Sequence, residues 1–241
     1  MPQRAKQMLR SLRRFYHQRT ASRDIGLRHE TSFWDRWFQT AGLEWPDEYN
    51  ARLDPSRPLG GIVTELADAI DAPIVRILDV GAGPLTLLGK IHPRKTLDIT
   101  ATDVLAPVYD DLLRRYGVTP LVRTLAADAE LLTATFPANH FHIVHAQNCL
   151  DHMQNPLRAI EQMLEVTAGG GAMVLIHREN EAEFEDYAGL HQWNFTAISN
   201  TFIIHNPRQR YDVSAAFDGK AQMSCTVHEG WLTVLFRKAA V

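Results

Sequence analysis

Residues 74–84, with the sequence IVRILDVGAGP, decide the fold of this 241-residue chain. The first seven of them form an apolar run rich in β-branched side chains, which predicts a buried strand. Gly81 and Gly83 follow at once, and glycines at this point allow a tight turn and the close approach of a ligand to the backbone. Pro84 suits the first turn of a helix. The stretch therefore predicts a strand, a glycine turn and a helix near 85–91.

Apolar runs of the same kind alternate with helical stretches over the next hundred residues. We expect further strands at 97–102, 121–126, 140–146 and 171–177, and helices at 105–116, 129–134 and 154–166. Near-continuous apolar strands separated by helices indicate a parallel sheet that is covered on both faces. Right-handed crossovers place the functional residues of such a sheet at the carboxyl ends of its strands.

The C-terminal part of the sequence predicts an antiparallel end to this sheet. A helix near 181–189, a strand near 201–205 and a helix near 211–217 lead to two final strands at 221–228 and 231–238. The link between these last two strands is too short for a parallel crossover, so they form an antiparallel hairpin. The predicted fold class is α/β. Residues 71–241 form a doubly wound, seven-stranded, mostly parallel sheet that ends in the hairpin.

The composition excludes several classes of protein. A formal net charge of −3, with 22% charged residues, gives no general reason to expect nucleic-acid binding. No apolar run approaches the roughly 20 residues needed to span a membrane, and we recognise no secretory signal. The two cysteines, Cys149 and Cys225, do not make a disulfide framework. We expect a cytoplasmic protein.

The first 28 residues differ from the rest in charge. They carry eight basic side chains and one acid, a formal charge of +7, and the remainder has 17 basic and 27 acidic residues, a charge of −10. Met8, Leu12, Phe15 and Tyr16 follow helical spacing and predict an amphipathic helix with a solvated basic face. A transit peptide or an anchor to an anionic surface is the alternative interpretation.

Acidic residues follow the second and third predicted strands, at the edge where the glycine turn lies. Asp103, in Thr102-Asp103-Val104, comes 20 residues after Gly83, and a carboxylate here can accept two hydrogen bonds from a ribose diol. Asp128 can accept a hydrogen bond from an exocyclic amine. Each acid could instead cap the helix that follows it. Thr86 occupies the third-glycine position of the dinucleotide fingerprint, which argues against a nicotinamide oxidoreductase.

Together these segments resemble the class I S-adenosylmethionine-dependent methyltransferases, in the broad subgroup that includes the ubiquinone and menaquinone methyltransferases. Residues 77–84 are similar to the first motif of that family, Asp103 to its ribose-binding acid, and Asp128-Ala129 to its adenine-proximal pair. Residues 141–152 are similar to its fourth-strand segment. The resemblance covers about residues 74–180.

One departure is visible at His142, where the family usually has an acid. Gly169-Gly170-Gly171, by contrast, is similar to the turn that precedes the fifth strand of the family. The resemblance implies a Rossmann-like fold, S-adenosyl-L-methionine as the cofactor, and methyl transfer as the activity.

The resemblance also implies a set of cofactor-binding residues. They are Asp79, Gly81, Ala82, Gly83, Asp103, Val104, Asp128, Ala129, Gln147 and Asn148. Asp79 is interpreted either as a group near the amine of the cofactor or as a residue that orients the glycine loop.

His152 and His191 are the candidate catalytic residues. His152 follows the fourth strand where the transferred methyl group is expected, and it can act as a general base or bind the acceptor. His191 opens the polar-aromatic sequence HQWN, which can form the wall of an acceptor pocket. The candidate acceptor-binding residues are Asp151, Trp193 and Asn194. The alternative is that His152 packs or caps a helix and that Trp193 is buried.

No metal site is expected. His140 and His142 would share one face of a strand and His145 would point to the other face, so these three residues do not suit one ion.

Residues 1–70 are expected to form a helical N-terminal extension or lid, with a short amphipathic helix at 62–70. Trp34, Trp37 and Arg52 are interpreted either as a lid over the cofactor, with Arg52 holding a carboxylate through two hydrogen bonds, or as core packing.

The sequence thus predicts methyl transfer to a hydroxyl or amine of a polar small molecule, such as a sugar or natural-product intermediate. The alternatives are an RNA or protein methyltransferase that uses the basic N-terminus, and a non-catalytic module that retains the cofactor site. The sequence does not name the acceptor or the oligomeric state.

Overall fold

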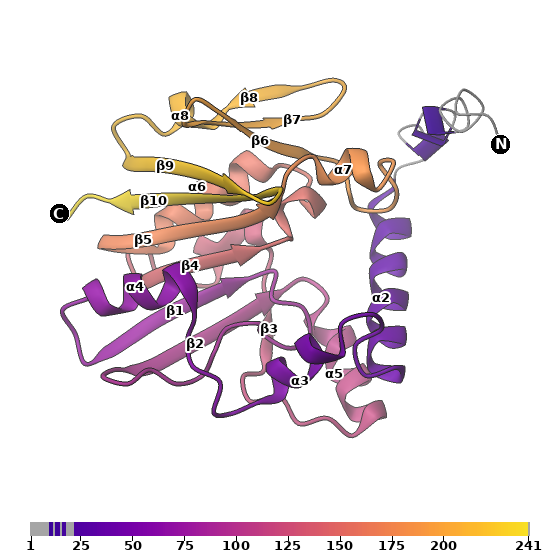
Figure 1. Cartoon of the computed structure of the whole chain (residues 1–241), viewed down its shortest axis with the longest axis horizontal. Helices are drawn as coiled ribbons and strands as arrows, with labels where there is room; N and C mark the ends of the chain where they lie inside the picture. Colours follow the sequence, from indigo (N-terminus) through magenta and orange to yellow (C-terminus); the bar gives the residue numbers. More distant parts are fainter. Residues whose placement is uncertain (1–9, 12, 15, 18–21, 241) are drawn as a thin grey trace.

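The computed structural model describes residues 10–11, 13–14, 16–17 and 22–240, which form a seven-stranded and a three-stranded sheet. The larger sheet has the strand order β3-β2-β1-β4-β5-β10-β9 (Figure 1). Its parallel strands are β1 (Ile74–Val80), β2 (Thr96–Asp103), β3 (Thr124–Ala126), β4 (Phe141–Gln147) and β5 (Thr167–Arg178). The predicted seven-stranded, mostly parallel sheet is confirmed.

The two last strands form the predicted antiparallel hairpin. β9 (Ala221–His228) pairs with β10 (Trp231–Lys238), and β10 also pairs antiparallel with β5. The order of the parallel strands reverses between β1 and β4. A crevice opens at such a reversal because the connections on its two sides run in opposite directions. This register places Asp79 directly opposite His145 of β4.

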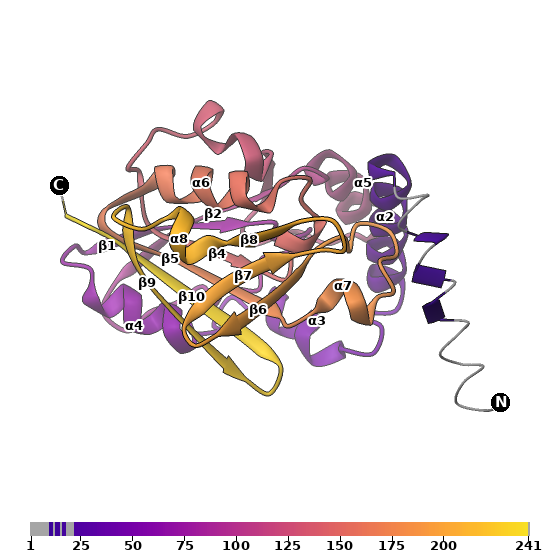
Figure 2. The ribbon, with the colours of Figure 1, turned by 90° about the horizontal axis from the view of Figure 1, so that it is seen from above.

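Successive side chains of the central strands point to opposite faces of the sheet. Leu78 and Val80 pack in one apolar cluster with α6 (Pro156–Val166), and Val75 and Ile77 pack in another with α4 (Gly61–Ala69). Figure 2 shows these two helices on opposite sides of the sheet. The sheet is therefore buried on both faces, which explains the near-continuous apolar sequence of its strands.

A three-stranded sheet packs on the same face of the large sheet as α6, over strands β9 and β10. It consists of β6 (Asn194–Ile198), β7 (Thr201–His205) and β8 (Arg210–Asp212). Phe195 and Phe202 from this sheet share an apolar cluster with Phe236 of β10. β7 was predicted, but β6 and β8 were not. β8 is three residues long, and so few residues leave little periodic signal. β6 is as long as β7, but its first residue, Asn194, was interpreted as part of a pocket wall.

Helices α2 (Arg23–Gln39), α3 (Pro46–Leu53) and α4 lie in the N-terminal extension, whose described residues before α2, at 10–11, 13–14 and 16–17, are also helical. α2 lies against α5 (Ala106–Tyr116), where aromatic side chains of both helices share a third apolar cluster (Figure 1). Met8, Leu12 and Phe15 lie outside the described residues. None of the helices formed by the described residues combines the length and apolar character needed to cross a bilayer.

The helix predicted near 85–91 is wrong, because these residues form an irregular loop whose last residue, Ile91, makes a β-bridge with Pro58. The backbone groups of this loop bind the N-terminal extension instead of bonding within a helix. The N–H groups of Lys90 and Ile91 donate to the carbonyl of Arg57, whose guanidinium donates to the carbonyl of Leu87. A Cβ on Gly89 would lie 2.0 Å from the carbonyl oxygen of Pro58. The extension and the loop therefore fold against each other.

Other predicted elements are shorter than expected. The third strand begins at Thr124 rather than at 121. The helices predicted at 181–189 and 211–217 shrink to α7 (Glu181–Phe184) and α8 (Val213–Ala216). Residues 129–134 form a 3-10 helix, η1 (Ala129–Ala134), and a second such turn, η2 (Leu150–His152), follows β4.

Candidate active site

A cavity of about 650 Å³ opens at the carboxyl ends of β1, β2 and β4. Its other walls come from α2, from η2 and from the segment that leads into β6. Residues on its wall include Asp79, Gly81, Ala82, Gly83, Asp103, Val104, Ala129, Gln147 and Asn148. The structure thus brings together all the cofactor-binding candidates except Asp128, from four loops that are separate in the sequence.

The glycine turn is held by the carboxylate of Asp103. Its Oδ2 atom accepts a hydrogen bond from the backbone N–H of Gly83 at 3.2 Å, and its Oδ1 atom accepts one from Leu105 at 2.9 Å. Burial raises the pKa of Asp103 to about 6, and these two hydrogen bonds lower it in part. Asp103 therefore links the ends of β1 and β2 at the floor of the cavity.

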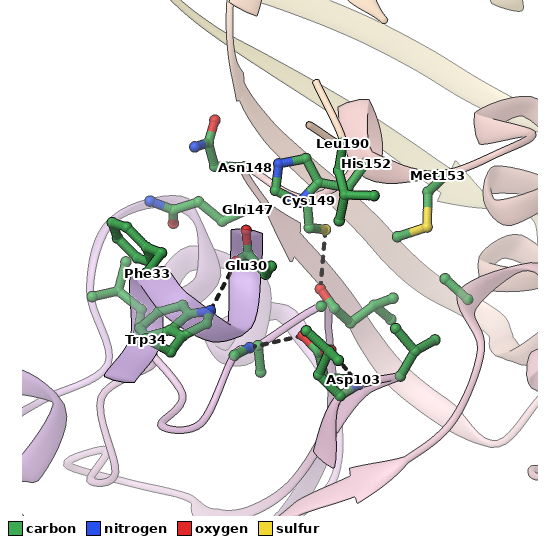
Figure 3. Close-up of a pocket in the computed structure, with 18 of the residues that line it drawn as sticks. Glu30, Phe33, Trp34, Asp103, Gln147, Asn148, Cys149, His152, Met153 and Leu190 are labelled. Carbon is green, nitrogen blue, oxygen red and sulfur yellow. Dashed lines mark hydrogen bonds between the residues drawn. The ribbon is translucent and has the colours of Figure 1, made fainter. Parts of the chain in front are cut away.

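Gly81 and Gly83 cannot be replaced by larger residues without displacing their neighbours. Their φ angles are +65° and +66°, in the left-handed region that favours glycine. A Cβ on Gly81 would lie 2.5 Å from the Cβ of Cys149, and a Cβ on Gly83 would lie 2.7 Å from the ring of Trp34. The Cys149 thiol in turn donates a hydrogen bond to the carbonyl of Val80 (Figure 3).

Asp79 uses both carboxylate oxygens within the protein. Oδ2 accepts a hydrogen bond from the hydroxyl of Thr86, and Oδ1 lies 2.7 Å from Nδ1 of His145. Only 3% of Asp79 is exposed, although it borders the cavity. These contacts correspond to the interpretation in which Asp79 orients the loop.

Asp128 is not among the residues that line the cavity. Its Oδ1 atom accepts from the backbone N–H of Glu130 and caps η1, and its Oδ2 atom lies 3.3 Å from the guanidinium of Arg23. Its neighbour Ala129 and its partner Arg23 both face the cavity. The capping alternative for Asp128 thus describes its present contacts, and its contact with adenine remains a prediction.

The N-terminal extension forms one wall of the cavity. Trp34 lies against Gly83 and donates through Nε1 to Glu30 at 2.8 Å. Arg52 donates to the carbonyls of Ala82 and Leu85 and pairs with Glu48. Figure 3 shows Glu30 and Trp34 on one side of the cavity, opposite His152 and Met153. Arg52 therefore holds a carboxylate, as the sequence suggested, but the carboxylate belongs to the protein.

The charge and size of the cavity suit S-adenosylmethionine. Seven acids, Glu30, Glu48, Asp79, Asp103, Glu130, Glu181 and Glu185, border it against three arginines, Arg23, Arg52 and Arg178. A negative surplus favours a ligand that carries a positively charged sulfur. The volume lies within the usual range for ligand pockets, about 300–1,000 Å³. Asp103 lies on the wall of this cavity at the end of β2, and its contact with a ribose remains a prediction.

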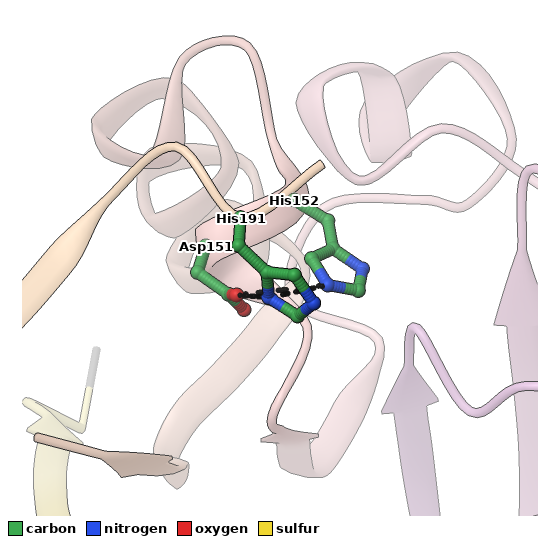
Figure 4. A group of neighbouring side chains, drawn as sticks. All are labelled: Asp151, His152 and His191. Atoms are coloured by element: carbon green, nitrogen blue, oxygen red, sulfur yellow. Dashed lines mark hydrogen bonds and ion pairs between the residues drawn. The ribbon is translucent and has the colours of Figure 1, made fainter. Parts of the chain in front are cut away.

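Asp151, His152 and His191 come together at the other end of the cavity. Nδ1 of His191 lies 2.6 Å from Oδ2 of Asp151 and 3.2 Å from Nε2 of His152. Figure 4 shows both rings and the carboxylate directed toward one another, from η2 and from the segment before β6. The two histidines border the cavity, and Asp151 lies behind them with 1% of its surface exposed. The structure thus joins both catalytic candidates to Asp151.

The pKa values of this cluster reflect its close contacts. Burial tends to raise the pKa of Asp151, but the nearby charge of His152 and the hydrogen bond from His191 lower it overall. For His191, burial tends to lower the pKa, but the hydrogen bond and charge of Asp151 raise it overall. Asp151 and His191 therefore stabilise each other as an ion pair.

Trp193 and Asn194 lie away from the main cavity. The indole of Trp193 donates to the carbonyl of Met153 at 3.0 Å and borders a smaller hollow. Asn194 is fully buried, donating to the hydroxyl of Tyr187 and accepting from the N–H of Glu183. Of the HQWN sequence, only His191 borders the main cavity, because Gln192 and Trp193 line the smaller hollow and Asn194 begins β6.

Sequence reasoning missed several groups near the cluster of Asp151, His152 and His191. Glu181 and Glu185, in and after α7, border the cavity, and His177 at the end of β5 is buried with neither ring nitrogen hydrogen-bonded within the described residues. Burial lowers the pKa of His177 to about 3, which keeps it neutral. Its place at the carboxyl end of a predicted strand was the available signal.

His142 and His145 have separate partners on the two faces of β4. His142 accepts a hydrogen bond from the backbone N–H of Arg76 at 3.1 Å, and its other ring nitrogen contacts the Arg76 guanidinium. His145 contacts Asp79 as described above. The departure from the family pattern at His142 therefore lies beside Arg76, at a distance from the cofactor acids.

Comparison with known proteins finds one family model that matches part of the chain. Residues 78–175 match the family model described as "Methyltransferase domain". No curated protein sequence matches the chain.

Solved structures of methyltransferases share the fold. The CurJ carbon methyltransferase superposes with a TM-score of 0.52 and 15% identity, over 74% of this chain and 52% of that chain. A Methanococcus maripaludis protein, assigned as an S-adenosyl-L-methionine-dependent methyltransferase, gives 0.50 and 9%, over 88% and 93%. The trans-methyltransferase CalH, in complex with SAH, gives 0.50 and 15%, over 74% and 55%. The chain thus spans about half the length of the first and third of these.

Proposed function

Because residues 78–175 match a model of a methyltransferase domain, we propose that this protein transfers a methyl group from S-adenosylmethionine to a hydroxyl or amine of a polar small molecule. One observation carries the proposal. A single cavity borders both the glycine turn with Asp103 and the histidines of the Asp151–His152–His191 cluster. A cofactor at one end and an acceptor at the other would therefore share one enclosed space.

The end of the cavity beside the glycine turn, called here the cofactor end, would bind and orient S-adenosylmethionine. When bound, S-adenosylmethionine supplies an activated methyl group, so the protein mainly positions the reactants and excludes water. The backbone at Gly81 and Gly83 permits close approach, and Asp103 accepts hydrogen bonds from the ribose. Asp128 would accept one from the adenine amine once Arg23 moves aside.

The acceptor end holds the nucleophile and its proton. His152 borders the cavity and would take the proton of an acceptor hydroxyl, while His191, held by Asp151, would hydrogen-bond the acceptor. An amine acceptor needs proton removal less. A sugar or natural-product intermediate suits the polar and acidic side chains of this end.

Two features support a small acceptor rather than RNA or protein. Several side chains of the basic N-terminus already have partners within the chain, since Arg10 and Arg14 pair with Asp186 and Arg23 pairs with Asp128. The cavity also has α2 as one wall, and Gly26 of α2 lies against Leu190 beside His191. These contacts support the assignment of residues 1–70 as an extension that acts as a lid on the domain at 71–241.

Calorimetry with the purified full chain tests the cofactor part of the proposal. We expect S-adenosylmethionine to bind with one site per chain, and Asp103→Ala to weaken binding by about 1–3 kcal/mol, because a charge-assisted contact is lost. Asp98→Ala is the matched control, because Asp98 lies exposed on the same strand. Absence of binding by the unchanged protein would overturn the proposal.

The acceptor class is tested by incubating the protein with S-adenosylmethionine and panels of hydroxyl- and amine-bearing small molecules. Mass spectrometry would detect a 14-Da gain on the acceptor, as one methyl replaces one hydrogen. Methylation of RNA or protein substrates, with none of the small molecules modified, would favour the macromolecular alternative.

A further inference from the structure

The three groups at the acceptor end converge in the way that metal ligands do. Nε2 of His152, Nδ1 of His191 and Oδ2 of Asp151 lie 2.6, 3.2 and 3.6 Å from one another. Ligands at 2.0–2.1 Å from a tetrahedral zinc ion are about 3.3 Å apart, since each ligand pair spans an edge of the tetrahedron. The two longer separations already match that edge, and the short one is a hydrogen bond that an ion would replace.

The carboxylate in this cluster is incompletely satisfied. Asp151 is 1% exposed, and its Oδ1 atom has no hydrogen-bond partner among the described residues. A buried carboxylate oxygen without a partner costs free energy, so such groups normally pair with a donor or a cation. Oδ1 belongs to the same carboxyl group that contacts both histidines through Oδ2.

The position of the cluster leaves room for a further ligand. His152 and His191 border the cavity, while Asp151 closes the side away from it. Three protein ligands with a free position is the arrangement of catalytic zinc sites, where the fourth position takes water or substrate. Glu181 and Glu185 border the same end of the cavity and add negative charge that favours a cation.

We propose that Asp151, His152 and His191 form a binding site for a divalent transition-metal ion, with zinc as the ion that suits two imidazoles and one carboxylate. The free position faces the acceptor end of the cavity. There the ion would bind the acceptor oxygen and lower the pKa of its hydroxyl, whose proton would pass to water because both imidazoles hold the ion, and the oxygen would attack as an alkoxide. This role rests on the proposed function, but the ion site itself does not. Because methyl transfer exchanges no electrons, a redox-inactive ion is sufficient.

The test uses the full chain without a polyhistidine tag, cleared of metal with a chelator that is then removed. Zinc chloride is titrated by calorimetry, and cobalt(II), which replaces zinc in such sites, is titrated by visible absorption. We expect one ion per chain, a Kd of micromolar or tighter, and cobalt absorption bands of four- or five-coordinate strength. His152→Ala and His191→Ala should each weaken zinc binding at least tenfold. His228→Ala, at an exposed histidine on β9, should leave it unchanged.

Each outcome has a distinct meaning. Failure of the unchanged protein to bind zinc, while it binds S-adenosylmethionine, overturns the metal site and leaves the imidazole as the proton acceptor of the proposed function. Zinc binding without S-adenosylmethionine binding supports the site and overturns the proposed function. Equal zinc affinity in the three variants would place the ion elsewhere and overturn the site. If a histidine variant does not fold, the cobalt spectrum of the unchanged protein decides, because six-coordinate bands alone contradict the site.

Discussion

The two ends of the cavity are built in different ways. At the cofactor end, the glycine turn and Asp103 lie within 25 residues of one another and depend on backbone conformation, with φ near +65° at Gly81 and Gly83. At the acceptor end, Asp151 and His191 are 40 residues apart and depend on side chains that meet in space. A site made of backbone groups depends on residues that are close in the sequence, whereas a cluster of distant side chains forms only when the whole chain folds. The changes below act on one end while the other end serves as the control.

The largest expected effect is on turnover, from His152→Ala. Loss of the group that deprotonates or positions the acceptor should lower kcat about 10²–10⁴-fold. The affinity for S-adenosylmethionine, measured by calorimetry, should stay within about twofold, because His152 belongs to the acceptor end. His228→Ala provides the control for a histidine outside the cavity. Unchanged turnover in His152→Ala would remove this residue from the mechanism, and an equal loss of cofactor affinity would remove the distinction between the two ends.

Gly83→Ala should destabilise the protein at the cofactor end of the cavity. The new Cβ meets the Trp34 ring at 2.7 Å, and φ is +66°, so strain and overpacking together should cost about 2–5 kcal/mol of unfolding free energy. Gly117→Ala is the matched control, because Gly117 has φ of +65° with open space around its Cβ and should cost only about 1–2 kcal/mol. Urea unfolding measures both. If the two variants lost the same unfolding free energy, the Trp34 side chain would be able to move aside at little cost, and its contact with residue 83 would not exclude a Cβ.

The affinity for S-adenosylmethionine should depend on pH through Asp103. In the proposed function the cofactor binds the ionised carboxylate of Asp103, and burial raises the pKa of Asp103 to about 6 in the free protein. Binding should therefore tighten as pH rises through 6, with Kd about tenfold weaker at pH 5 than at pH 8. Asp103→Asn should bind more weakly and lose this dependence. The same dependence in Asp103→Asn would assign it to another group.

Asp103 also has an effect on stability, of opposite sign to most carboxyl groups. Its pKa in the folded, unliganded protein lies above the ordinary value of 3.8, so the folded state holds the proton more tightly than the unfolded state. The contribution of this group to stability is therefore present at low pH and is lost as pH rises from about 4 through 6. Comparing the melting temperatures of the unchanged protein and Asp103→Asn across this range measures it.

The smallest expected effect comes from Arg52→Met, which tests how far the N-terminal extension supports the cofactor end. Arg52 donates to the carbonyls of Ala82 and Leu85 and lies over the rings of Trp34 and Trp37. Its loss should cost about 1–3 kcal/mol of stability, and cofactor affinity should fall with it. Arg114→Met, at an exposed arginine of α5, is the control. A stability loss with no change in affinity would show that the extension supports the fold alone.

Much of the cofactor end was predictable from the sequence because its signals are local. The strand at 74–80, the two glycines and Asp103 were placed correctly, and the hairpin followed from the short link between two strands. The helix after the glycine turn was wrong for a physical reason. Its backbone groups bind Arg52 and Arg57 of the extension, residues that precede the loop by about 30 positions.

The acceptor end was predictable only as a set of candidates. His152 and His191 were chosen from their positions after strands, but their contact with each other and with Asp151 was not foreseen. Trp193 and Asn194 stood beside His191 in sequence and were expected to share its role. Instead, Trp193 packs in an apolar cluster and Asn194 begins β6 of the small sheet.

The sequence by itself determined the seven strands of the larger sheet, the glycine turn and the acid that holds it, because hydrophobic periodicity and backbone freedom depend on residues close together in the chain. Only the tertiary structure decided that the extension would replace a helix beside the glycine turn, and that two imidazoles and a carboxylate would meet at one point. These outcomes depend on which segments, distant in sequence, compete for the same hydrogen-bonding groups and the same buried space.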